Sequence, residues 1–146
     1  LDFGLSRFIG DVRSEAHGTS RSAAADPTDG TANEAWTRSD VVVGTLGYFS
    51  PEAAVGEPPD PMFDVWSLSV VLYEAATGRN PFLGGSVTDV LQRIIEASVP
   101  DPRALAPALP MPLADCLQRA LSRNRRLRPQ SARELRQSLE ALRRRI

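Results

Sequence analysis

The sequence predicts a mainly α-helical domain preceded by a long irregular arm. A length of 146 residues and a hydrophobic content of 42% suit one globular domain. From residue 64 onward, apolar residues recur at intervals of three and four, which is the spacing of buried helix faces. Strand-like alternation is nearly absent. These observations favour a helical bundle over a sheet-based fold.

The arm covers residues 10–40, which are rich in Ser, Thr, Asp, Ala and Gly and carry almost no large apolar side chain except Trp36. Such a stretch cannot bury enough apolar surface to order itself, so we expect a long mobile loop. His17 lies in this arm without a cysteine or an acidic cluster at ligand spacing, which argues against a metal site there.

The first two helices are predicted from their composition and caps. Residues 64–77 are apolar nearly all round and are followed by Gly78, as in a core helix with a glycine C-cap. Asp64 suits the N-cap of this helix. Ser86 and Asp89 resemble a capping box that opens a second helix. The apolar face of that second helix holds Val87, Val90, Leu91, Ile94 and Ile95.

Two further helices follow a proline-rich connection at 100–112. The apolar stripe of the third helix holds Leu113, Cys116, Leu117, Ala120 and Leu121. Cys116 is therefore interpreted as a buried thiol rather than a nucleophile. Ser131 and Glu134 form a second capping box, which opens the last helix. That helix is expected to bury Leu135, Leu139 and Leu142.

The charge is unevenly distributed. All 17 basic residues are arginines, and ten of them lie from Arg119 onward against only Glu134 and Glu140. This basic end could bind nucleic acid or anionic lipid, or it could be a solvated helix face that balances the acidic remainder. No aromatic residue is interleaved with these arginines, so we expect no nucleic-acid binding.

The most apolar segment, residues 65–76, contains Ser67, Ser69 and Glu74 and is too short and too polar to span a bilayer. We therefore expect a soluble chain in the cytoplasm. The single cysteine allows no internal disulfide, which agrees with that location.

Three short motifs stand in a fixed order along the chain. Asp2, Phe3 and Gly4 open it, and residues 44–52 read Gly-Thr-Leu-Gly-Tyr-Phe-Ser-Pro-Glu. The third motif starts at Asp64 and continues through the apolar helix. Asp-Phe-Gly alone is a weak match, since it also suits a turn capped by an aspartate. Together the motifs resemble the protein kinase catalytic domain, from its metal-binding element onward.

The resemblance implies a protein-kinase-like α+β fold, of which this chain is the mainly α-helical C-lobe portion with a long activation loop. Residues 1–52 would hold the Asp-Phe-Gly motif, the activation segment and the Ser-Pro-Glu motif, and residues 53–146 the helical C-lobe. In this family Glu52 would form a buried ion pair with Arg128, and Asp64 would anchor the backbone of the catalytic loop. Ser69 takes the place of a glycine, which puts close packing there in question.

The catalytic roles are also implied by the resemblance. Asp2 would bind Mg²⁺ on the phosphates of ATP, with Phe3 packed behind it and Gly4 completing the cofactor-binding element. Thr45 would support the catalytic loop and the substrate hydroxyl, as in serine/threonine kinases. Family phosphorylation sites precede the Gly-Thr pair by a few residues, which points to Thr37 and Ser39.

The resemblance is closest to bacterial serine/threonine kinases of the eukaryotic type, whose partners are ATP and protein substrates. Such kinases often carry a membrane span outside the catalytic domain, so attachment of a longer parent protein stays open. The glycine-rich loop, the phosphate-contacting lysine and the catalytic-loop aspartate are absent from this sequence. We therefore expect the isolated chain to be inactive. The alternative is a non-catalytic kinase-like interaction module or a degraded gene product.

Overall fold

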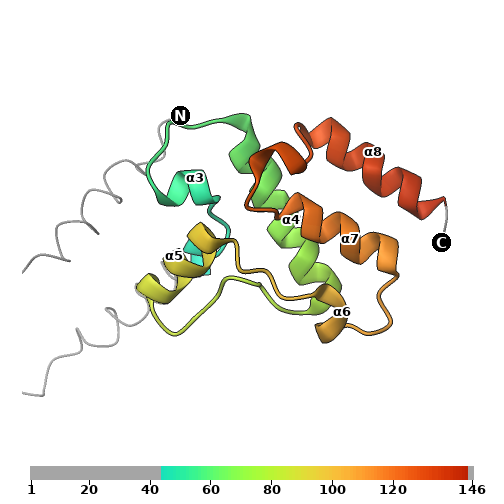
Figure 1. The fold of residues 1–146 in the computed structure, drawn as a ribbon, viewed down its shortest axis with the longest axis horizontal. Coiled ribbons are helices and arrows are strands. Elements are labelled where there is room, and N and C mark those ends of the chain that lie inside the picture. Colours follow the sequence, from blue (N-terminus) through green and yellow to red (C-terminus); the bar gives the residue numbers. More distant parts are fainter. Residues whose placement is uncertain (1–43, 145–146) are drawn as a thin grey trace, which may run out of the picture. The chain divides into compact units, whose positions relative to one another are not determined.

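The computed structural model describes residues 44–144, all of which belong to one compact unit (Figure 1). Four site residues predicted from the sequence, Asp2, Phe3, Gly4 and Thr37, lie outside the described residues, as does Ser39. The expected long loop at 10–40 lies outside them as well.

Residues 44–144 form helices joined by turns and contain no strand, as expected for the helical part of the domain. The helices are α3 (Pro51–Ala54), α4 (Pro61–Thr77), α5 (Val87–Glu96), α6 (Pro102–Leu105), α7 (Met111–Ala120) and α8 (Ala132–Arg143), with a 3₁₀ turn η1 at Arg125–Leu127. The four longer helices correspond to the four predicted ones. Helix α6 interrupts the proline-rich connection, where no helix was predicted.

Helix α4 begins three residues earlier than predicted, and Asp64 is not its N-cap. Asp60 holds that position, because its side chain accepts a 2.7 Å hydrogen bond from the backbone N–H of Met62. Pro61 follows as the first helical residue, where its missing N–H costs nothing. Asp64 lies in the first turn instead, where a negative charge still complements the helix dipole.

The other predicted caps are confirmed. Gly78 ends α4 with a φ of 74°, a left-handed conformation that favours glycine. The Ser86 side chain accepts from the N–H of Asp89 at 3.1 Å, and that of Ser131 accepts from the N–H of Glu134 at 3.1 Å. Each hydroxyl satisfies a backbone donor that the helix itself leaves unpaired.

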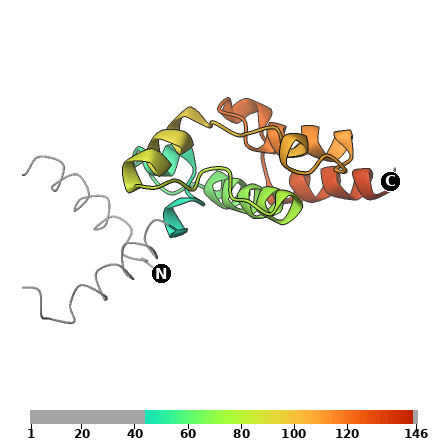
Figure 2. The same cartoon turned by 90° about the horizontal axis from the view of Figure 1, so that it is seen from below.

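Helices α6, α7 and α8 all pack against α4, and α3 packs against α5. Figures 1 and 2 show α7 and α8 lying alongside α4. One buried cluster joins Met62 and Val65 of α4 to Ala120 of α7 and Leu135 of α8. Cys116 is buried, as predicted. This packing makes α4 the helix that α6, α7 and α8 share.

Two large apolar residues of α4 are nevertheless exposed. Leu68 is 44% exposed and Val71 is 48% exposed, although the helix was predicted to be buried all round. The prediction was therefore wrong for this side of α4 within the described part of the chain. No helix among residues 44–144 is long and apolar enough to cross a membrane.

Candidate functional site

The candidate site is the segment at 44–52, which is fixed at its end by an ion pair. Glu52 lies in the first turn of α3, and Arg128 directly follows η1. Arg128 Nη2 lies 2.9 Å from Glu52 Oε1, and Nη1 donates to Oε2 at 3.0 Å. The Arg128 side chain is 0% exposed and that of Glu52 is 12% exposed. The expected ion pair is thus present, with the two-pronged geometry that strengthens arginine–carboxylate contacts.

Two further donors of the Arg128 guanidinium bind backbone carbonyls. Nε donates to the carbonyl of Ser122 at 2.7 Å, and Nη2 donates to the carbonyl of Arg123 at 3.3 Å. The guanidinium carbon lies 4.5 Å from the centre of the Trp66 ring, a favourable position for a cation over an aromatic face. A buried arginine therefore links α3, the loop after α7 and the middle of α4.

The protonation of Glu52 reflects this setting. Burial by itself raises the pKa of Glu52, but hydrogen bonding to Arg128, with help from a backbone N–H and the Arg128 charge, outweighs burial. The net effect is a pKa below the ordinary value of 4.5. Glu52 therefore remains ionised at neutral pH, which keeps the pair intact.

Ser50, which stands in the place of the family's alanine, has a local structural role. Its buried hydroxyl accepts from the N–H of Ala53 at 3.1 Å and so caps α3. Pro51 then takes the first position of the helix. This cap orients the first turn of α3, which carries Glu52 toward Arg128.

Tyr48 ties the middle of the segment to α4. Its hydroxyl donates to Glu74 Oε2 at 2.7 Å, and its carbonyl accepts from the Ser67 hydroxyl at 2.8 Å. The hydrogen bond to Glu74, followed by burial and the Glu74 charge, raises the pKa of Tyr48 above 10.0. The tyrosine therefore stays protonated and keeps donating through the neutral range.

Gly47 allows the segment to approach the turn that follows α4. The Asn80 side chain donates to the Gly47 carbonyl at 3.4 Å and accepts from the N–H of Phe82 at 2.9 Å. A methyl group added at Gly47 would lie 3.0 Å from Leu83 Cδ2 and 3.2 Å from Asn80 Nδ2. Any larger residue at position 47 would therefore push against the ends of the Leu83 and Asn80 side chains, which glycine leaves in place.

Thr45 lies two residues before this anchored part, in a helical turn at 44–46, and it is exposed. Its carbonyl accepts from the N–H of Tyr48 at 3.3 Å, so the turn is joined directly to the anchored tyrosine. The structure therefore places Thr45 and Glu52 on one continuous, supported segment.

The remaining predicted residues behave differently. Asp64 is exposed and has no ion pair within residues 44–144. Ser69 is fully buried, and its hydroxyl donates to the carbonyl of Val65 at 2.7 Å, so the serine fits where the family has glycine. No three His, Cys, Asp or Glu side chains within the described part of the chain are placed to hold a metal. Asp2, the predicted magnesium ligand, lies outside that part.

The sequence alone predicted no role in the site for Tyr48, Trp66, Ser67, Glu74 or Asn80. Tyr48 and Glu74 are 26 residues apart, and Gly47 and Asn80 are 33 apart. No local spacing joins such pairs, and they meet only because the segment packs on α4 and on the turn that follows it.

Most of the chain matches the sequences of known proteins. A family model described as "Protein kinase domain" matches residues 1–139. The chain is 43% identical over 95 residues to the DNA damage-responsive serine/threonine-protein kinase RqkA of Deinococcus radiodurans, covering 65% of this chain and 14% of that protein. It is 36% identical over 140 residues to the serine/threonine-protein kinase PknB of Mycolicibacterium smegmatis, covering 95% of this chain and 19% of that protein.

The fold has counterparts among solved structures. The autoinhibited serine kinase domain of the giant muscle protein titin superposes with a TM-score of 0.56 at 23% identity, over 62% of this chain and 28% of that chain. This likeness concerns the fold. The chain thus spans only a small part of the relatives and structures that it matches.

Proposed function

The chain belongs to the protein kinase family, and we propose that it forms the C-lobe part of an ATP-dependent serine/threonine kinase that phosphorylates proteins. The curated relatives are bacterial serine/threonine kinases, which supports this reaction class. The observation that carries the proposal is the buried Glu52–Arg128 pair, because it fixes the segment that bears Thr45. A rigidly held segment is what positioning of a substrate hydroxyl requires.

Asp2 is the residue at which this chain would bind Mg²⁺ and, through the metal, ATP. Protein kinases generally use both, and a carboxylate oxygen is the type of ligand that Mg²⁺ prefers. The bound metal would neutralise charge that develops on the transferred phosphoryl group. In this proposal Asp2 binds the metal, and Phe3 and Gly4 complete the motif around it.

Thr45 would act as a positioning group for the substrate hydroxyl. It is exposed, whereas the segment beside it is anchored through Gly47 and Tyr48. The anchors leave this part of the segment accessible to a protein substrate while limiting its motion. Phosphate on Thr37 or Ser39 would add negative charge just upstream and would regulate the segment by pairing with arginine.

The chain by itself lacks groups that phosphoryl transfer needs. Its sequence has no lysine, and it has no His-Arg-Asp motif that would supply a catalytic base. We therefore propose that these groups come from other parts of a longer protein, which acts in the cytoplasm. The exposed Leu68 and Val71 on α4 agree with further chain packing against this helix.

The test is phosphorylation by a longer parent protein with Asp2→Asn. We expect loss of phosphoryl transfer to a generic protein substrate with an unchanged melting temperature, because the substitution removes a charged metal ligand and little volume. Asp115→Asn is the matched control, since Asp115 is exposed on α7 far from the motif in sequence. Full activity of Asp2→Asn in Mg²⁺ would refute the proposed role of Asp2. Phosphoryl transfer by the 146-residue chain alone would refute the proposal that other parts of a longer protein supply the missing groups.

A second candidate is a non-catalytic interaction module. The absence of lysine from the sequence favours it for the isolated chain. Assays of the parent protein distinguish the two candidate functions. A parent that binds protein partners but neither binds nor turns over ATP would establish the interaction module. ATP-dependent phosphorylation by the parent would exclude it.

A further inference from the structure

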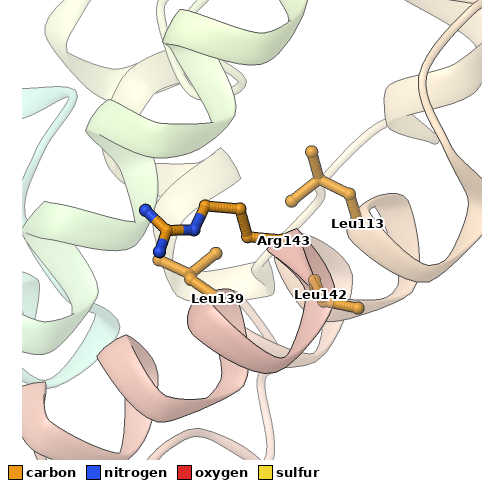
Figure 3. A pocket seen from close by; sticks show the side chains of 4 residues that line it. All are labelled: Leu113, Leu139, Leu142 and Arg143. Carbon is orange, nitrogen blue, oxygen red and sulfur yellow. The ribbon is translucent and has the colours of Figure 1, made fainter. Parts of the chain in front are cut away.

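A small apolar pocket lies between α7 and α8, away from the segment at 44–52. Leu113 of α7 and Leu139, Leu142 and Arg143 of α8 line it, with a volume of about 330 Å³ (Figure 3). This volume is at the lower end of the range of about 300–1,000 Å³ that is typical of small-molecule sites. The leucines were predicted to be core residues, yet all three are only partly buried.

Arg143 is the one charged residue among the four that line the pocket. Its side chain is exposed and makes no ion pair within residues 44–144. Glu140, the nearest acid along the helix, is instead placed toward Arg136, with a separation of 3.8 Å. In Figure 3 the Arg143 side chain runs alongside Leu139, and its guanidinium lies on the side away from Leu113 and Leu142. The guanidinium is therefore available to an anion at the rim of an apolar hollow.

The chemistry of the residues that line the pocket favours an acyl chain over a peptide as its occupant. A buried peptide brings N–H and C=O groups that must be paired. Of the four lining side chains, only that of Arg143 carries a polar group, and it is a donor without any acceptor. An acyl chain needs no such partners, because it has a single polar group at one end. An anionic end group would match the planar donors of the arginine.

We propose that this pocket binds an anionic amphiphile, namely a medium-chain fatty carboxylate, with its hydrocarbon chain among Leu113, Leu139 and Leu142 and its carboxylate on Arg143. This ligand site is separate from phosphoryl transfer, and its test does not depend on kinase activity.

The experiment titrates the full 146-residue chain with sodium decanoate below its micelle concentration. Binding is followed by calorimetry and by NMR of the leucine methyl groups. We expect saturable binding at one site and chemical-shift changes centred on the three lining leucines. Decanol should bind more weakly than decanoate, since it has the same chain without the charge.

Arg143→Gln should weaken decanoate binding by about tenfold, because a charge-assisted contact is lost. Arg143→Lys keeps the charge near the helix C-terminus and should retain part of the affinity. Arg133→Gln is the matched control: Arg133 is exposed in the first turn of α8 and does not line the pocket, so this variant should bind as the original chain does. Melting temperatures of all variants verify that they are folded.

Three results would overturn the proposal. The first is the absence of saturable decanoate binding below the micelle concentration. The second is equal affinity for decanol and decanoate together with no effect of Arg143→Gln. The third is a set of chemical-shift changes centred on another surface, such as Leu68 of α4. Leucine methyl shifts report the location directly, so this result is clear even if a variant proves unstable.

Discussion

At the scale of single residues, Arg128 makes the most contacts that matter for the candidate site. It pairs with Glu52, donates to two backbone carbonyls and lies over Trp66, and its side chain has no exposed area. A buried charge of this kind is stable only while its partners remain. The contacts of Arg128 therefore hold α3 and the end of the segment at 44–52 in place.

Replacing Arg128 with methionine should lower the free energy of unfolding by about 3–5 kcal/mol, because Glu52 would be left partly buried without its cation. Denaturant unfolding of the 146-residue chain measures this loss. Arg126→Met serves as the control, since Arg126 is exposed and has no ion pair within the described residues. Equal stability of the two variants would show that the pair contributes little.

The Glu52–Arg128 pair also predicts a pH dependence. The pKa of Glu52 is lower in the folded chain than its ordinary value of 4.5, so its ionised form stabilises the fold above that pH. This contribution should disappear as the pH falls through the lowered pKa. The difference in unfolding free energy between the original chain and Glu52→Gln should therefore be constant from pH 7 to about 5 and shrink below 4.5. A difference that does not change with pH would contradict this assignment.

At the scale of elements, α4 is the helix that the other parts share. It packs against α6, α7 and α8 and presents Ser67 and Glu74 to the anchored Tyr48. Its start is fixed by Asp60 and its end by Gly78. The position of the candidate site thus depends on the register and length of this helix.

The N-cap of α4 can be tested by comparing two aspartates. Asp60→Ala should lower the melting temperature, because it removes the acceptor for the Met62 N–H and the ion pair with Arg125. Asp64→Ala should have a much smaller effect, since Asp64 is exposed and lies inside the helix. Thermal unfolding by circular dichroism measures both. A larger fall in melting temperature for Asp64→Ala than for Asp60→Ala would support Asp64 as the N-cap, as the sequence alone suggested.

At the scale of the whole molecule, local sequence patterns predicted the helices and their caps, but they did not predict the contacts between residues that are far apart in the chain. Ser86, Ser131 and Gly78 act on backbone groups a few residues away, so their roles as caps could be predicted from spacing. The contacts of Tyr48 and Asn80 could not, because they join residues that are 26 and 33 positions apart. The Glu52–Arg128 pair, 76 positions apart, was expected only through the family resemblance.

The exposed face of α4 gives a prediction that compares this chain with a longer parent. Leu68→Gln and Val71→Gln should change the unfolding free energy of the 146-residue chain by no more than about 0.5 kcal/mol, because both side chains are already nearly half exposed and Gln is a good helix former. In a parent kinase domain, where further chain is proposed to cover this face, the same changes should cost about 2 kcal/mol or more each. Val65→Ala is the control, since Val65 is buried here and should destabilise both proteins. Equally small effects of the glutamine variants in both proteins would show that this face of α4 stays exposed in the complete domain.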